Sequence, residues 1–75
     1  MELMVLYAET FGKNLANARK SLDLKQTVVA LETGLLQSDI SRLEQGTYIG
    51  VKVLRYLIYL RSKGVDINKI FEITV

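Results

Sequence analysis

Residues 26–46 read QTVVALETGLLQSDISRLEQG, and this stretch decides the fold that we expect for the whole chain. Apolar residues recur at helical spacing on both sides of Gly34, and these are Val29, Ala30, Ile40 and Leu43. A glycine lets the chain take a left-handed conformation and begin a second helix at a steep angle. The pattern therefore predicts two short helices, over about residues 26–33 and 37–45, joined by a tight turn.

Two short helices joined in this way are typical of a helix-turn-helix, whose second helix can lie in the major groove of DNA. Ala30 is small at the position where two crossing helices need a close approach. The apolar residues of the second helix are three or four apart and should face inward: Leu36, Ile40 and Leu43. This leaves a polar outer face made of Gln37, Ser38, Ser41, Arg42 and Gln45.

Residues 11–46 resemble the phage-repressor-like helix-turn-helix family, of the Cro and lambda-repressor type. The resemblance rests on Phe11, Arg19, Gln26, Val29, Ala30, Gly34, Ile40, Ser41, Glu44 and Gly46. It continues loosely to about residue 71 and implies an all-α fold, a compact domain of four to five helices. We expect one domain over residues 1–75, with an N-terminal arm (1–7), a helical core (8–71) and a tail (72–75).

The resemblance also implies where DNA would be contacted. The positions that match base-edge or adjacent phosphate contacts are Gln37, Ser38, Ser41 and Arg42. Gln pairs bidentately with adenine, Ser bonds to several bases, and Arg grips guanine or a phosphate. Phosphate contacts, which position a protein without reading sequence, are expected from Gln26, Lys25, Thr47 and Lys52, with Tyr48 as a further candidate. The alternative for Tyr48 is that it packs against the fourth helix.

Arg19 and Glu44 are expected to be structural. In the family that the chain resembles, the matching arginine and glutamate pair and tie the first helix to the end of the third. A bidentate, partly buried pair suits a guanidinium better than an ammonium. Neither residue is therefore expected to contact DNA.

Some positions depart from the family pattern. Val28 and Leu31 are apolar on the outer face of the second helix, where relatives usually have polar residues. Because exposed apolar side chains contribute nothing to stability and reduce solubility, we expect the arm 1–7 or a partner chain to cover them.

Leu36 occupies a position where the family often has Ser or Thr as a helix cap, so Ser38 or Asp39 is expected to cap a shorter helix. Asp39 has three alternative roles: it complements the positive end of the helix dipole, accepts from a cytosine amino group, or repels a phosphate.

Further helices are expected over about residues 9–21, 51–63 and 67–71. The arm 1–7 is left open between a continuation of the first helix and a strand. Gly64 should end the fourth helix and Asp66 should cap the fifth. The residues that should close the core are Ile67, Ile70 and Phe71. The apolar tail either folds back on the core or supplies a dimer contact, through Ile70, Phe71, Ile73 and Val75.

Composition excludes several classes of function. Cysteine and histidine are both absent, which excludes disulfides, thiol nucleophiles, imidazole bases and the usual zinc sites. We expect no enzymatic activity, cofactor, metal or small-molecule ligand. No apolar run approaches the roughly 20 residues of a membrane span, and the N-terminus does not read as a signal peptide. A cytoplasmic location without membrane contact is expected.

The leading interpretation is a sequence-specific, double-stranded DNA-binding transcriptional regulator. It would act as a repressor at a palindromic operator, as a homodimer with the helix over about 37–45 in the major groove. A formal net charge of +2 is low for a DNA-binding protein, but a basic face can be local. The alternative is a protein–protein interaction module, for example an antitoxin or anti-regulator, that keeps the fold with weak or no DNA binding.

Overall fold

Four α-helices and one short 3₁₀-helix make up the part of the chain that the computed structural model describes, residues 2–48 and 50–72. They are α1 (Glu2–Ser21), α2 (Gln26–Thr33), α3 (Gln37–Gln45), α4 (Lys52–Ser62) and the 3₁₀-helix η1 (Ile67–Phe71). No strand occurs among these residues, so the all-α prediction is confirmed. The predicted bounds of α2 and α3 are also confirmed. Each helix ends before a glycine in the left-handed conformation, Gly34 with φ 76° and Gly46 with φ 75°.

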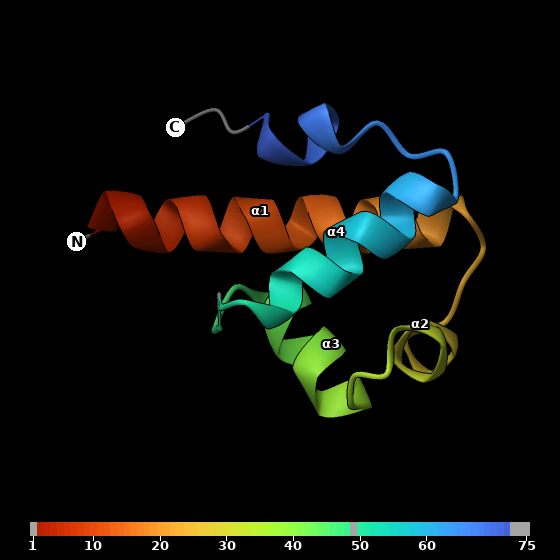
Figure 1. Cartoon of the computed structure of the whole chain (residues 1–75). Coiled ribbons are helices and arrows are strands. Elements are labelled where there is room, and N and C mark those ends of the chain that lie inside the picture. The colour runs from red at the N-terminus through yellow and green to blue at the C-terminus, as the bar shows by residue number, and fades with distance from the viewer. Residues whose placement is uncertain (1, 49, 73–75) are drawn as a thin grey trace.

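The long helix α1 is the element on which the others are arranged (Figure 1). It packs against α3 on one side and η1 on the other, while α4 contacts α2, α3 and η1. The core between them is formed by buried side chains from every element: Phe11, Leu15, Val29, Ala30, Ile40, Leu43, Tyr56, Leu57, Leu60 and Ile70. This core supports α3 from behind and leaves its other face outside.

Residues 2–7 continue α1 and do not form a separate arm. The helix begins at Glu2, seven residues before the predicted start near Glu9, because apolar residues at three- to four-residue spacing already extend the pattern. The expectation that this segment covers the outer face of α2 is wrong. Val28 is 38% exposed and Leu31 is 83% exposed in the single chain.

The C-terminal part follows most of the sequence pattern. Gly64, with φ 91°, follows the end of α4, and the Asp66 side chain caps η1 by accepting from the Asn68 N–H. Ile70 is buried and Ile67 partly buried. Phe71 departs from the prediction because it remains 55% exposed, with its ring 5.1 Å from that of Phe11. The expected tail contacts of Ile73 and Val75 lie outside the described residues.

Two glycines allow α1 to approach the end of α3. A Cβ atom on Gly12 would lie 2.5 Å from the carbonyl oxygen of Glu44 and 2.7 Å from that of Leu43. A Cβ atom on Gly46 would lie 2.6 Å from the carbonyl oxygen of Ala8, and its positive φ is itself unfavourable for other residues. The backbones of α1 and of the end of α3 therefore lie so close together that no residue with a Cβ atom fits at position 12 or 46 without a shift of the backbone.

A buried carboxylate, that of Glu44, connects the four α-helices. From α1, Arg19 donates to it bidentately, with Nε 2.7 Å from Oε2 and Nη2 2.9 Å from Oε1. The Gln26 side chain of α2 donates to Oε1 at 3.0 Å, and the Tyr56 hydroxyl of α4 donates to Oε2. The structure thus contains the expected Arg19–Glu44 ion pair, extended by two donors that the sequence did not indicate.

These donors determine the protonation of Glu44. Burial raises the pKa of its carboxyl, but the hydrogen bonds from Arg19, Tyr56 and Gln26 outweigh burial and hold the pKa below its ordinary value. Glu44 is therefore charged in the folded protein at neutral pH, and burial and the Glu44 carboxylate together raise the pKa of Tyr56.

Gly12→Ala tests the close approach of α1 and α3. Alanine normally stabilises a helix interior by roughly 0.5–1 kcal/mol relative to glycine. Here the methyl group meets backbone atoms, so we expect the free energy of unfolding to fall by roughly 1–3 kcal/mol. Urea denaturation measures the change, and Lys13→Ala, at an exposed position of the same helix, is the control. A stabilised Gly12→Ala protein would contradict the packing.

Tyr56→Phe tests the charged state of Glu44. The variant removes a hydrogen bond to a buried carboxylate, so we expect it to lower the free energy of unfolding at pH 7 by roughly 1.5–3 kcal/mol. Because the pKa of Glu44 is lower in the folded chain, its stabilising contribution is complete above about pH 4.5 and declines as pH falls through the lowered value. The deficit of the variant should shrink over that range.

Urea denaturation at pH 7, 4 and 3 measures this dependence. Tyr59→Phe is the matched control, since the Tyr59 hydroxyl donates to Glu32 at the surface and exposed contacts contribute little. Equal losses in the two variants, or a Tyr56→Phe deficit that does not change with pH, would contradict the role of Glu44.

Candidate nucleic-acid interface

The outer face of α3 is polar and accessible. Gln37, Ser38 and Arg42 are exposed, and Ser41 is partly exposed. Gln45 lies one turn after Ser41, and its Nε2 donates to the Ser41 hydroxyl at 2.9 Å. The four residues predicted to contact bases therefore share one helix face that no other described part of the chain covers.

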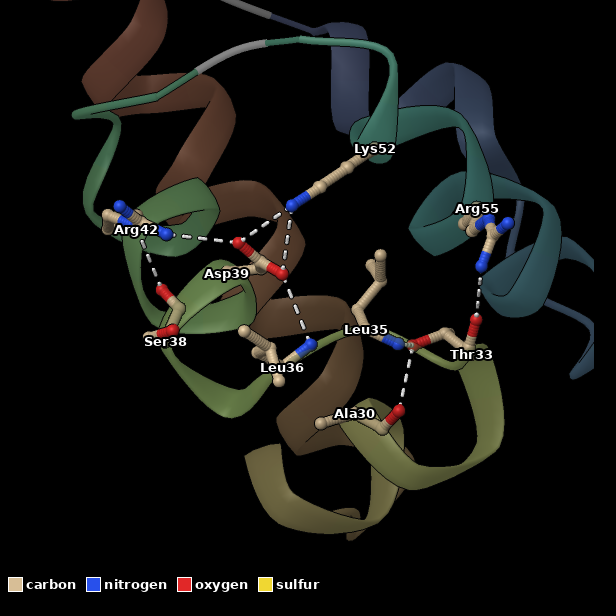
Figure 2. A network of polar contacts seen from close by, with 9 residues as sticks. All are labelled: Ala30, Thr33, Leu35, Leu36, Ser38, Asp39, Arg42, Lys52 and Arg55. Carbon is tan, nitrogen blue, oxygen red and sulfur yellow. Dashed lines mark hydrogen bonds and ion pairs between the residues drawn. The ribbon is translucent and has the colours of Figure 1, made fainter.

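Asp39 anchors a polar network at the first turn of α3 (Figure 2). Its Oδ1 accepts from Arg42 Nη2 at 3.0 Å, and its Oδ2 accepts from the Leu36 backbone N–H at 3.1 Å. Lys52, at the start of α4, lies 3.3 Å from both oxygens. One carboxylate thus holds two of the cations that were predicted to contact DNA.

The position of Asp39 bears on two of its three predicted roles, and the third, repulsion of a phosphate, stays a prediction. The residue is only 2% exposed, and the Leu36 N–H, Lys52 and Arg42 together lower the pKa of its carboxyl despite burial. An acceptor for cytosine would have to be open to solvent, so that alternative is wrong. Asp39 instead satisfies a backbone donor before the first turn, where negative charge also complements the helix dipole. The helix still begins at Gln37 and is not shortened.

Gln26 is placed differently from the prediction. Its side-chain amide donates to Glu44 and is partly buried, whereas a free side chain at the first turn of α2 was expected to meet a phosphate. Lys25, immediately before it, is exposed. Of these two predicted phosphate contacts, Lys25 is exposed, whereas Gln26 is partly exposed and its amide is bound to Glu44.

The loop between α3 and α4 contains one accessible predicted contact and one packed residue. Thr47 is exposed and its hydroxyl donates to the Arg42 carbonyl at 3.3 Å. Tyr48 is partly buried against the core, and its hydroxyl occupies the space where a Cβ atom on Gly50 would lie. Tyr48 thus packs against the core, and its phosphate contact stays a prediction.

Arg55 is a further cation that sequence reasoning did not select. Its Nη1 donates to the Thr33 carbonyl at 3.4 Å, beside the turn between α2 and α3 (Figure 2). Lys52 and Arg55 are three residues apart in α4, a spacing that places both on one helix face. That spacing is the feature of the sequence from which Arg55 could have been predicted to lie beside Lys52. With Arg42, they place three cations around the start of α3.

Apolar side chains border the same region. Leu36, Val51 and Leu54 line a shallow groove between the start of α3 and the start of α4, and Ile58 lines a neighbouring one. Val51 is 80% exposed and Ile58 is 68% exposed. Val51, immediately before α4, and Leu54 and Ile58 of α4 recur at three- and four-residue spacing. They make an uncovered apolar stripe along that helix in the single chain.

The described residues contain no group of three or more acidic side chains arranged to hold a metal ion. In the same part of the chain, every helix is too short or too polar to cross a membrane. No protein-family model, curated protein or solved structure matches this chain significantly.

Proposed function

We propose that this chain is a sequence-specific, double-stranded DNA-binding transcriptional regulator of the phage-repressor-like type, with α3 inserted in the major groove. The observation that supports the proposal best is the uncovered polar face of α3, which carries Gln37, Ser38, Ser41 and Arg42. A glutamine, two hydroxyls and a guanidinium are side chains that bond to base edges. The helix that presents them is held on its other face by the core.

The distribution of charge also supports DNA binding. Two of the eight acidic residues, Asp39 and Glu44, are buried and paired with cations. Arg42, Lys52 and Arg55 lie around the start of α3, beside the Asp39 carboxylate, which offsets one of the three charges. Positive charge is therefore concentrated there although the formal net charge of the chain is only +2. Together with Lys25 and Thr47, Arg42 and Lys52 would contact phosphates on either side of the reading helix. Arg55 lines the same grooves as Val51, Leu54 and Ile58 and is not assigned a phosphate contact.

We further propose that the protein acts as a homodimer at a palindromic operator, in the cytoplasm and as a repressor. Two α3 helices in a symmetric dimer would enter successive major grooves about 34 Å apart. The apolar stripe of Val51, immediately before α4, and of Leu54 and Ile58 on α4 supplies a surface for self-association, because such a stripe is unfavourable in water. An antitoxin that represses its own operon is compatible with the same geometry.

A protein–protein interaction module is the second candidate, and the exposed apolar residues favour it. Besides the stripe on α4, Leu31 is 83% exposed on α2. A module that binds a partner protein would use these surfaces, and the polar face of α3 would then be solvated without a ligand.

Duplex binding separates the two candidates. We expect the protein to bind a random-sequence 20-bp duplex at micromolar concentration in 50 mM salt, as measured by fluorescence anisotropy, with affinity falling steeply as salt rises. Arg42→Ala should reduce differences in affinity between duplex sequences by roughly 1–3 kcal/mol. Lys52→Ala should weaken all sequences alike and reduce the salt slope by about 1.

Two outcomes would count against this proposal. Absence of binding at micromolar protein in 50 mM salt would favour the interaction module. Equal, small effects of Arg42→Ala and Lys52→Ala would contradict the assignment of α3 as the reading helix.

Self-association has its own test. We expect sedimentation equilibrium to give a dimer for the wild-type chain and a monomer for Ile58→Glu, because a charge placed in an apolar interface must lose its water. Leu31→Glu, a change of the same kind on α2, is the matched control and should remain dimeric. A monomeric wild type, or dissociation by Leu31→Glu alone, would contradict the choice of α4.

A further inference from the structure

The side chains of Arg42 and Lys52 come from different helices but share a single anion. Arg42 belongs to α3 and Lys52 to α4, and both contact Asp39 within 3.3 Å (Figure 2). Arg42 is held at a second point, since its Nε donates to the Ser38 carbonyl at 3.3 Å. The direction of the guanidinium is therefore set before any ligand arrives.

The burial of the three partners is unequal. The Asp39 side chain is 4% exposed, whereas those of Arg42 and Lys52 are 55% and 47% exposed. A buried carboxylate fixed by the Leu36 N–H thus holds two cations that still face solvent. A ligand can reach both cations without displacing the anion beneath them.

The charges of the cluster do not cancel. One carboxylate with two cations leaves a single net positive charge where two side chains are available for phosphate or base contact. Because non-specific duplex affinity depends on the number of phosphates neutralised, an anion here weakens binding to every duplex. An arginine whose direction is fixed, in contrast, retains its geometric selectivity for one base edge.

We infer that Asp39 is a positioning residue that sets sequence selectivity: it orients Arg42 and Lys52 and cancels one of their two charges, which lowers affinity for DNA in general. This inference rests on the proposed DNA-binding function. A purely structural Asp39 would only cap α3, and its loss would then change stability without changing the salt dependence of DNA binding.

Asp39→Asn separates these two roles. The amide oxygen of asparagine can still accept from the Leu36 N–H, but the charge is lost. We expect binding to a random-sequence 20-bp duplex to become about tenfold tighter at 50 mM salt and the slope of log K against log salt to steepen by about 0.9. Affinities across a panel of duplexes of differing sequence should become more uniform.

Asp66→Asn is the matched control. It makes the same chemical change at another capping carboxylate, on η1, and adds the same net charge away from α3. We expect its slope to stay within about 0.3 of the wild-type value, a small part of the change expected for one phosphate contact. Equal slopes for the two variants, or an unchanged spread of affinities in Asp39→Asn, would overturn the inference.

A measurement without DNA tests the positioning role of Asp39 even if the protein does not bind duplex or the variant does not fold. In ¹⁵N relaxation of the arginine side chains, we expect Arg42 Nε of the wild type to be more ordered than Arg61 Nε, at an exposed position of α4, and to lose this order in Asp39→Asn. If neither protein binds duplex, the proposed function fails and this comparison alone decides the positioning role. If Asp39→Asn does not fold, the wild-type comparison decides it, and equal mobility of the two arginines overturns it.

Discussion

The Glu44 carboxylate is the contact on which the arrangement of the helices depends. It lies near the end of α3 and accepts hydrogen bonds from Arg19 of α1, Gln26 of α2 and Tyr56 of α4. Removing a carboxylate from water is costly, and apolar replacements of buried ion pairs are often as stable. We therefore attribute to this network a directional role. A hydrophobic core alone would tolerate several helix angles, whereas four hydrogen bonds from three side chains to two oxygens are compatible with few.

The same helix carries a second buried carboxylate, that of Asp39, whose side-chain partners are exposed to solvent. Glu44 binds side chains that are buried or partly buried, and Asp39 binds two cations that remain accessible. Between these two anions, α3 is fixed at its end by the core and at its start by the Leu36 N–H. The close approach at Gly12 and Gly46 brings α1 against the end of α3. The backbone of α3 is thus held from both ends while the side chains of its outer face stay accessible to a ligand, which is what the proposed reading of DNA requires.

The sequence predicted those parts of the structure that depend on local spacing. Glycines in left-handed conformation made the bounds of α2 and α3 predictable, and the resemblance made the Arg19–Glu44 pair predictable. Contacts between residues distant in sequence were missed, because periodicity does not give distances between helices. Gln26 and Lys52 were therefore expected only as phosphate contacts, and local spacing did not indicate that Tyr56 is fully buried and donates to Glu44. The length of α1 and the exposure of Phe71 were predicted incorrectly for a related reason. Apolar spacing shows which residues of a helix can be buried, but it does not show which other helix packs on them.

Binding-site selection from a pool of random duplexes tests the central claim most directly, because it asks at once whether the outer face of α3 reads sequence and whether two chains act together. If α3 reads DNA in a symmetric dimer, selection enriches a palindrome whose half-sites are about one helical turn of DNA apart. A pool that stays random after repeated rounds at low salt, although the protein is folded, would contradict that claim.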